Sequence, residues 1–342
     1  MRLFVTGGAG FIGSNFIRWV HANQPDVAIT NYDALTYAGN PANLADLEGD
    51  NRYTFVHGDV CDAGMLHSAL PGHDAVVHFA AESHVDRSIE GAADFIRTNV
   101  LGAGTIFETA MRLEIPRFLH ISTDETYGSV AEPGVFTEGD ALEPNSPYAA
   151  SKASADLLAR AYRVTHGYPI IVTRTSNNFG PYHYPEKVIP LFITNLIDGL
   201  PVPLYGDGRN VRDWTHVEDN VRAQWLVLTQ GEPGETYNVG AGNEMSNKDL
   251  TYRLLERFGK QGDEADAMIE FVADRPGHDL RYAIDSSRVR ALGWKPQLSF
   301  EEGLDATIAW YREREDWWRP LKAGGASRRQ GLRSAGAPAS QG

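Results

Sequence analysis

The chain has 342 residues, 42% of them hydrophobic, and a formal net charge of −14. This length suits one large α/β unit or two packed domains. The acidic balance argues against nucleic acid as a partner, because a phosphate backbone requires a cationic surface. Cys61 is the only cysteine, so an internal disulfide or a cysteine-based metal site is excluded.

Short β-rich segments alternate with longer helical ones through the first half of the chain. The expected strands are Leu3–Thr6, Ala28–Asp33, Tyr53–His57, Ala75–Ala80, Phe118–Ser122 and Ile170–Thr173. Helical periodicity between them covers Ile12–Ala22, Ala92–Leu113 and Pro147–Thr165. This alternation predicts an α/β fold, with a doubly wound parallel sheet of the Rossmann type and helices on both faces.

The sequence pattern changes after Arg174, which indicates a smaller C-terminal α/β unit. A turn-rich aromatic segment, 177–185, is followed by expected elements at Lys187–Leu200, Thr236–Gly240, Asp249–Gly259 and Leu304–Trp318. We expect a dinucleotide-binding domain at 1–175, joined by a strand and helix near 213–240, and a mainly substrate-binding domain at 176–322. Residues 323–342 are rich in Gly, Ala, Ser and Arg, and we expect a disordered tail there.

A glycine-rich turn follows the first expected strand and opens the first expected helix. Gly7 permits a tight turn, Gly10 lets the backbone approach a pyrophosphate, and Gly13 lets the helix pack close to the strand. The N-terminus of the helix favours phosphate. Asp33 ends the second expected strand, where its carboxylate would accept hydrogen bonds from ribose hydroxyls and repel a 2′-phosphate. The pattern therefore predicts NAD in preference to NADP.

Tyr148 and Lys152 are four residues apart on an expected helix and share one face. A nearby ammonium helps the phenol to lose its proton, so Tyr148 could act as the base for a substrate alcohol. Lys152 could also hold the nicotinamide ribose. The alternative is an ordinary surface pair.

Two adjacent carboxylates, Asp124 and Glu125, follow the expected strand that ends at Ser122. Ligands of an open α/β sheet bind at the carboxyl ends of its strands. A protonated acid beside an ionised base is what proton removal and water loss require. The alternative is a capping residue beside a solvated one. His120, inside the apolar strand, is expected to be a hydrogen-bonded core residue.

Several segments, taken in order, resemble the extended short-chain dehydrogenase/reductase family, and within it the nucleotide-sugar 4,6-dehydratases. The resemblance covers about Met1 to Lys322. It rests on 35–40 (LTYAGN), 80–88 (AAESHVDRS), 122–128 (STDETYG), 148–152 (YAASK), 177–187 and 274–279 (DRPGHD).

This resemblance implies a role for each matching position. Catalysis would use Thr123, Asp124, Glu125, Tyr148 and Lys152. NAD would be held by Gly7, Gly10, Phe11, Ile12, Gly13, Asp33, Leu35, Thr36, Asp59, Val60, Ala80, Ala81, Ser83, Thr98, Tyr148, Lys152 and Asn178. The nucleotide sugar would be held by Ser83, His84, Thr123, Asn177, Lys187, Val188, Pro203, Tyr205, Arg212, Asn247, Arg275 and His278.

The reaction implied is conversion of dTDP-glucose to its 4-keto-6-deoxy form, through oxidation at C4, loss of water across C5 and C6, and return of the hydride to C6. Alternatives are an epimerase, a decarboxylase or a UDP- or GDP-sugar dehydratase of the same fold, and a non-catalytic NAD-binding sensor. The family implies a homodimer through the Tyr148 helix and the helix near Asn99–Leu113. With scattered histidines and neither a leader nor an apolar span, we expect no metal, no membrane contact and a cytoplasmic location.

Overall fold

The computed structural model describes residues 1–323; apart from residue 323, the expected disordered tail lies outside the described residues. Seven parallel strands form the main sheet in the order β10-β6-β5-β4-β1-β2-β3. Their bounds are β1 Arg2–Thr6, β2 Ala28–Asp33, β3 Tyr53–His57, β4 Ala75–His78, β5 Arg117–Thr123, β6 Ile171–Thr175 and β10 Thr236–Val239. The doubly wound parallel sheet expected from the sequence is therefore confirmed.

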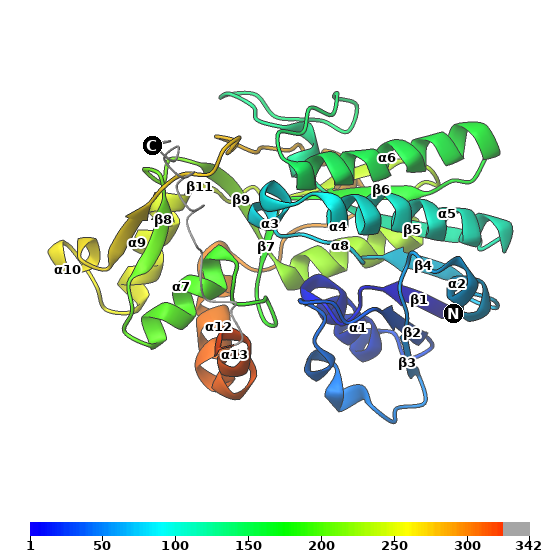
Figure 1. The fold of residues 1–342 in the computed structure, drawn as a ribbon, viewed down its shortest axis with the longest axis horizontal. Coiled ribbons are helices and arrows are strands. Elements are labelled where there is room, and N and C mark those ends of the chain that lie inside the picture. The colour runs from blue at the N-terminus through cyan, green and yellow to red at the C-terminus, as the bar shows by residue number, and fades with distance from the viewer. Residues whose placement is uncertain (324–342) are drawn as a thin grey trace, which may run out of the picture.

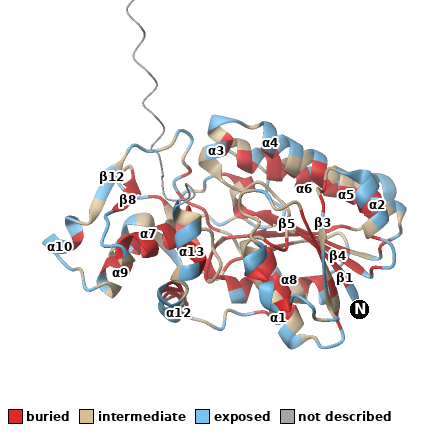
Figure 2. Cartoon of the chain, turned by 60° about the horizontal axis from the view of Figure 1, so that its bottom comes forward, coloured by how far each residue is buried: buried red, intermediate tan, exposed pale blue. Residues whose placement is uncertain are grey.

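Helices cover both faces of this sheet (Figures 1 and 2), because alternate side chains of each buried strand point to opposite faces. On one face, Leu3 and Val5 pack with α1 (Phe11–Asn23) and α8 (Val217–Gln230). On the other, Phe4 packs with a group of helices. These are α2 (Ala63–Ala69), α5 (Ala103–Arg112) and α6 (Pro147–His166).

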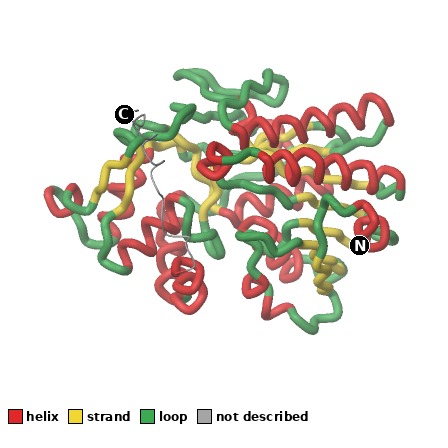
Figure 3. Tube along the Cα trace, in the orientation of Figure 1, coloured by secondary structure: helices red, strands yellow, loops and turns green. Residues whose placement is uncertain are grey.

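A smaller unit lies beside the main sheet, at the left of Figure 1, and has its own core. Its strands form a three-stranded sheet of β7 (Asn177–Phe179), β9 (Val211–His216) and β11 (Glu244–Ser246), and a two-stranded sheet of β8 (Val202–Tyr205) and β12 (Ile269–Val272). Figure 3 shows its helices beside these strands. They are α7 (Val188–Ile197), α9 (Asn247–Arg257), α10 (Asp263–Asp266), α12 (Phe300–Glu313) and α13 (Glu315–Leu321).

Two long helices expected from the sequence are interrupted. The segment 92–113 holds α4 (Ala93–Phe95), a π-helical stretch η3 (Ile96–Gly102) and then α5. The expected helix Leu304–Trp318 is two helices, since α12 ends at Glu313 and α13 begins at Glu315. The remaining short elements are α3 (Val85–Glu90), α11 (Ser287–Ala291) and the 3₁₀ turns η1 (Pro41–Asn43), η2 (Ala45–Leu47) and η4 (Asp124–Tyr127).

The chain reverses its direction of winding between β1 and β4, which are neighbours in the sheet. Such a switch point leaves a crevice at the carboxyl ends of the strands, where ligands bind. Because β10 pairs with β6, and α8 packs on the same sheet, we propose that this later segment belongs with residues 1–175 and that most of 176–322 forms the second domain. None of the described helices has the length and apolar character needed to span a membrane.

Candidate active site

A cavity of about 400 Å³ lies at this switch point, between the carboxyl ends of the strands and the smaller unit. Nearly all the positions singled out from the sequence line it, although their roles remain predictions. The exceptions are Leu35 and Pro203, which lie outside the lining. Residues from both units therefore meet at one cavity, as a reaction between a cofactor and a second ligand requires.

The glycine-rich turn forms one wall of the cavity. Gly7 has a φ of +70°, and a Cβ built there would lie 2.5 Å from the backbone nitrogen of Ala80. A Cβ on Gly13 would lie 2.3 Å from the carbonyl oxygen of Gly7. Gly10 is the N-cap of α1 and provides no side-chain cap, so the first N–H groups of the helix can receive an anion.

Asp33 lies at the end of β2, buried against the same turn. Its Oδ2 accepts a hydrogen bond from the Ala9 N–H at 2.9 Å, and its Oδ1 accepts one from the Leu35 N–H at 2.8 Å. Leu35 has a φ of +50°, so its contribution here is backbone geometry rather than its side chain. The carboxylate is therefore fixed in place, and each oxygen keeps a lone pair for a ribose hydroxyl.

Tyr148 and Lys152 lie on α6 and both reach the cavity. Pro147 occupies the first turn of the helix, and Ser146 caps it by accepting from the Ala149 N–H. The Lys152 ammonium donates to the Ile121 carbonyl at 2.7 Å. Burial lowers the pKa of Lys152 to about 8.

The phenol of Tyr148 differs from the sequence expectation of an easily lost proton. In the protein alone, burial raises the pKa of Tyr148 above its ordinary value, and the negative charges of Glu125 and Asp124 act in the same direction. A hydrogen bond with Thr123 acts in the opposite direction. A cationic nicotinamide beside the ring would also favour the phenolate.

The two adjacent carboxylates lie in η4, immediately after β5. Thr123 caps this turn, and its hydroxyl also donates to Asp124 Oδ1 at 3.2 Å. Burial and the charge of Glu125 raise the pKa of Asp124 well above its ordinary value. Burial also raises the pKa of Glu125, but the cations Arg212, Lys187 and Arg275 oppose that rise. Both pKa values are thus raised, that of Asp124 more strongly, so Asp124 is the carboxyl that keeps a proton more readily and Glu125 the one that ionises more readily.

The cations that act on Glu125 belong to the smaller unit and to the segment that leads into its helix α7. Lys187 donates to the Ser83 carbonyl at 2.8 Å. Arg212 donates to the Asp279 carbonyl at 2.9 Å, and its guanidinium carbon lies 4.0 Å from the centre of the Tyr282 ring. Both side chains are thus held at the cavity, close enough to act on the carboxylate pair and on an anionic ligand.

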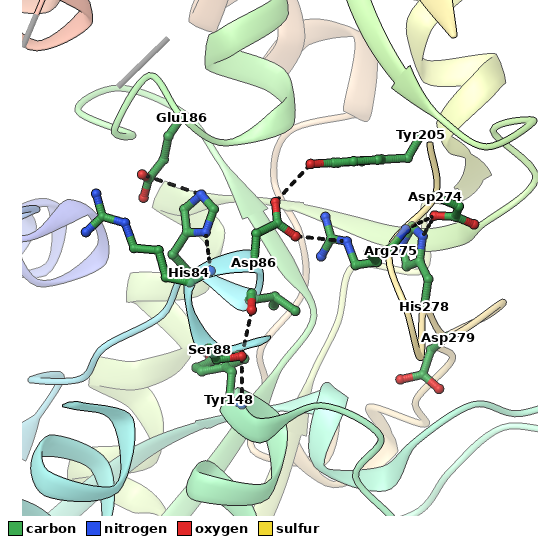
Figure 4. A network of polar contacts seen from close by, with 12 residues as sticks. His84, Asp86, Ser88, Tyr148, Glu186, Tyr205, Asp274, Arg275, His278 and Asp279 are labelled. Atoms are coloured by element: carbon green, nitrogen blue, oxygen red, sulfur yellow. Dashed lines mark hydrogen bonds and ion pairs between the residues drawn. The ribbon is translucent and has the colours of Figure 1, made fainter. Parts of the chain in front are cut away.

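Figure 4 shows how the start of α3 connects to the smaller unit. The Asp86 carboxylate accepts from the Tyr205 hydroxyl at 2.9 Å and pairs with Arg275 Nε at 3.2 Å. His84 Nε2 lies 3.5 Å from a Glu186 carboxylate oxygen. These contacts hold Arg275 and His84 at the cavity wall before any ligand arrives.

Several lining residues escaped the sequence analysis, although some lie inside the quoted segments. Tyr37 lies beneath the Arg87 guanidinium, whose carbon is 3.9 Å from the ring centre. Arg97 donates to Asp59 Oδ2 at 2.6 Å. Membership of a quoted segment could have pointed to Tyr37, but no pattern in the sequence links Arg97 to Asp59. The other missed lining residues include Asp86, Glu186, Asp279 and Tyr282.

These features fit NAD. The backbone cradle is too tight for any residue larger than glycine at Gly7 and Gly13, as close approach to a pyrophosphate requires. The fold and the cavity together define a dinucleotide-binding enzyme of the extended short-chain dehydrogenase/reductase type. Residues 4–307 match the family described as GDP-mannose 4,6 dehydratase, and the chain belongs to that family.

Individual relatives agree with this assignment. A dTDP-glucose 4,6-dehydratase from Streptomyces griseus is 52% identical over 328 residues, which cover 95% of this chain and 98% of its own. The crystal structure of DesIV, a dTDP-glucose 4,6-dehydratase from Streptomyces venezuelae with NAD and TYD bound, is 54% identical. It has a TM-score of 0.90 over 94% of this chain and 100% of that one. The structure of a UDP-glucose 4-epimerase from Thermus thermophilus, in complex with NAD, is 29% identical. Its TM-score is 0.83, and the match covers 92% of this chain and 100% of that one.

Proposed function

We propose that the protein is a dTDP-glucose 4,6-dehydratase that forms a 4-keto-6-deoxy sugar and regenerates its NAD in each cycle. The observation that carries this proposal is the unequal carboxylate pair, Asp124 and Glu125, on the same cavity as Tyr148 and Lys152. An epimerase of the same fold has no water to remove and would not need both carboxylates. Relatives of this name, at about half identity over nearly the whole chain, support the choice.

The first step is removal of the proton from the C4 hydroxyl of the sugar. We assign Tyr148 as the base, and Thr123 lies within hydrogen-bonding reach of its phenol. Lys152 sits one turn away on the same helix and stabilises negative charge on the phenol while it keeps its own proton. When bound, NAD accepts the hydride from C4 and later returns it to C6.

The second step is loss of water, which the new ketone at C4 makes possible by acidifying the hydrogen on C5. Glu125, whose pKa the surrounding cations lower against the effect of burial, takes that hydrogen as a proton. Asp124, kept protonated by burial and by Glu125, gives its proton to the departing C6 hydroxyl. Glu125 then holds the proton that returns to C5.

The remaining cations would bind the nucleotide diphosphate. We propose that Arg275 and Lys187 receive the phosphate oxygens, while Arg212, which has the largest charge interaction with Glu125 of the three cations, acts on the carboxylate pair. Local cations of this kind are needed because the protein as a whole is acidic. We place the protein in the cytoplasm, where NAD and nucleotide sugars are available.

The direct test is incubation with dTDP-glucose without added NADH. The expected product has lost one water by mass spectrometry and absorbs in alkali as a 4-keto sugar. A product of unchanged mass, epimerised at C4, would refute dehydration. Parallel incubations with UDP-glucose and GDP-mannose establish which nucleotide is accepted, and no turnover with any of the three would favour a non-catalytic NAD-binding protein.

We further propose a homodimer formed through η3, α5 and α6, which run side by side in Figure 1. Ile96, Leu101 and Leu157 are exposed on these elements, at 57%, 59% and 57%, and an apolar groove runs between the helices. Ala149 and Ala153 are buried within the subunit, so they belong to its own packing rather than to this face.

Light scattering tests the dimer. The Leu157→Arg variant should shift the mass toward that of a monomer, because it places a charge in an apolar contact. Leu200→Arg, on the smaller unit at 47% exposure, should leave the mass unchanged. A monomeric mass for the unmodified protein would refute the dimer.

A further inference from the structure

A buried ion pair lies behind the cavity wall and is not used by the reaction described above. Arg174, in β6, donates from Nε to Asp156 Oδ2 at 2.8 Å. A second nitrogen of the same guanidinium donates to the Tyr127 hydroxyl at 2.8 Å. The residues are nearly inaccessible to solvent, with exposed fractions of 7% for Arg174, 4% for Asp156 and 1% for Tyr127.

The two ends of this arrangement attach to the two reacting segments. Asp156 lies on α6, one turn after Lys152. Tyr127 is the last residue of η4, the turn that holds Asp124 and Glu125. One guanidinium therefore joins α6, which carries the proposed base for C4 oxidation, to η4, which carries the carboxylates proposed for water loss.

The Tyr127 end is itself firmly held. The ring stacks on Phe136, with centroids 5.0 Å apart and planes 12° from parallel. Its hydroxyl donates to Asn238 Oδ1 at 2.8 Å. The guanidinium carbon of Arg174 lies 4.7 Å from the ring centre, so the contact involves the face of the ring as well as the hydroxyl. A movement of Arg174 would therefore be transmitted to η4.

We propose that Arg174 is a positioning residue that sets the distance between the carboxylate turn η4 and the Tyr148–Lys152 face of α6, acting through Asp156 and Tyr127. This inference rests on the proposed function. A buried ion pair is weak evidence for stability, because removing two charges from water costs about as much as their attraction returns. Arginine suits such a role because its donors form a rigid planar fork, and misplacing reacting groups by about 1 Å can cost roughly 100-fold in rate.

Asp156 also acts on Lys152. Burial lowers the pKa of Lys152, and the Asp156 carboxylate acts in the opposite direction. Among the titratable and charged groups around this pair, His78 on β4 and His120 on β5 interact with the charge of Lys152, and Arg174 on β6 pairs with Asp156. Burial holds the pKa of His78 at about 3 and that of His120 well below its ordinary value, so both rings are neutral.

The Tyr127→Phe variant tests the inference, because it removes the acceptor for Arg174 and keeps the stack on Phe136. Its matched control is Tyr168→Phe, which removes another buried hydroxyl, one that donates to the Ile115 carbonyl at 3.1 Å. With full-length protein and bound NAD, we expect Tyr127→Phe to form the 4-keto-6-deoxy product about tenfold more slowly. The undehydrated 4-keto sugar, trapped with borodeuteride at quench, should accumulate. Tyr168→Phe should stay within about twofold of the unmodified protein.

A Tyr127→Phe variant with the rate and trapped sugar of Tyr168→Phe would overturn the inference while leaving the proposed function intact. If the unmodified protein forms no 4-keto sugar, the proposed function fails and the inference fails with it. The Asp156→Asn variant adds a readout that a purely structural role would not move. In the pH–rate profile of C4 oxidation, the fall in rate on the alkaline side should move to lower pH, because Lys152 loses the carboxylate that raises its pKa. An alkaline fall at the same pH as in the unmodified protein would contradict the effect of Asp156 on the pKa of Lys152.

Discussion

A methyl group added at Gly13 should displace the phosphate-binding turn. In the Gly13→Ala variant, the new Cβ would lie 2.3 Å from the Gly7 carbonyl oxygen and 2.8 Å from Gly8 Cα. Both contacts are with backbone, so no flexible side chain can move aside. Ordinary contact begins at 3.4 Å, and the turn must therefore open by about 1 Å.

Forcing a methyl group into a packed site of this kind costs about 1–3 kcal/mol. If binding of NAD requires the turn to close, that strain appears in the binding equilibrium as a loss of roughly 5- to 150-fold in affinity. The helix N-terminus would also move away from the pyrophosphate, which acts in the same direction. The fold should survive, because the strain is relieved when the turn opens.

Calorimetric titration with NAD, and the nucleotide retained after gel filtration, measure this effect. Gly104→Ala is the matched control: Gly104 also lies in a helix, α5, and its added Cβ would meet only Leu158 Cδ1, at an ordinary 3.7 Å. We expect the control to bind NAD normally. A Gly13→Ala variant that binds NAD as tightly as the control would refute the close-approach argument.

Three further predictions follow from the site. Asp33→Ala should weaken NAD binding and reduce the preference for NAD over NADP, because it removes the charge that repels a 2′-phosphate. Competition binding measures the ratio of the two affinities. Asp124→Asn should form the 4-keto sugar without loss of water, since an amide cannot protonate the C6 hydroxyl; a dehydrated product of normal yield would contradict its role. C4 oxidation should fall as the pH rises through about 8, because burial lowers the pKa of Lys152 to about 8 and the ammonium is lost above it; a rate profile that stays flat well above that pH would count against this.

Most of the main sheet could be predicted because its strands are short apolar runs between helical patterns. β2 and β3 have the bounds expected from the sequence, and β4 ends two residues earlier, at His78. The three-residue strands β7 and β11 are too short for alternation to be visible. The π-helical stretch η3, which packs against α6, was not predicted, because its pattern of apolar residues is the same as that of an ordinary α-helix.

The positions that line the cavity could be anticipated where they fall in recognisable segments, but the contacts among them could not. Arg174, for example, is separated by 18 residues from Asp156 and by 47 from Tyr127, and only the packing of β6 against α6 and η4 brings them together. His120 was expected to be a hydrogen-bonded core residue; its place in the core is confirmed, but the hydrogen bonding is not. It is buried, but neither ring nitrogen has a hydrogen-bond partner among the described residues, and the nearest carboxylate oxygen, on Asp156, lies 3.6 Å away.

Solvent exchange at C5 of the sugar shows directly whether Glu125 removes the C5 hydrogen. The Glu125→Gln variant is incubated with dTDP-glucose in deuterated water, and C5 is followed by NMR. Because the amide of the variant cannot take a proton, the variant should still oxidise C4 but place no deuterium at C5. Deuterium entering C5 at the rate of the unmodified protein would show that another group removes this hydrogen, and would contradict the role assigned to the paired carboxylates.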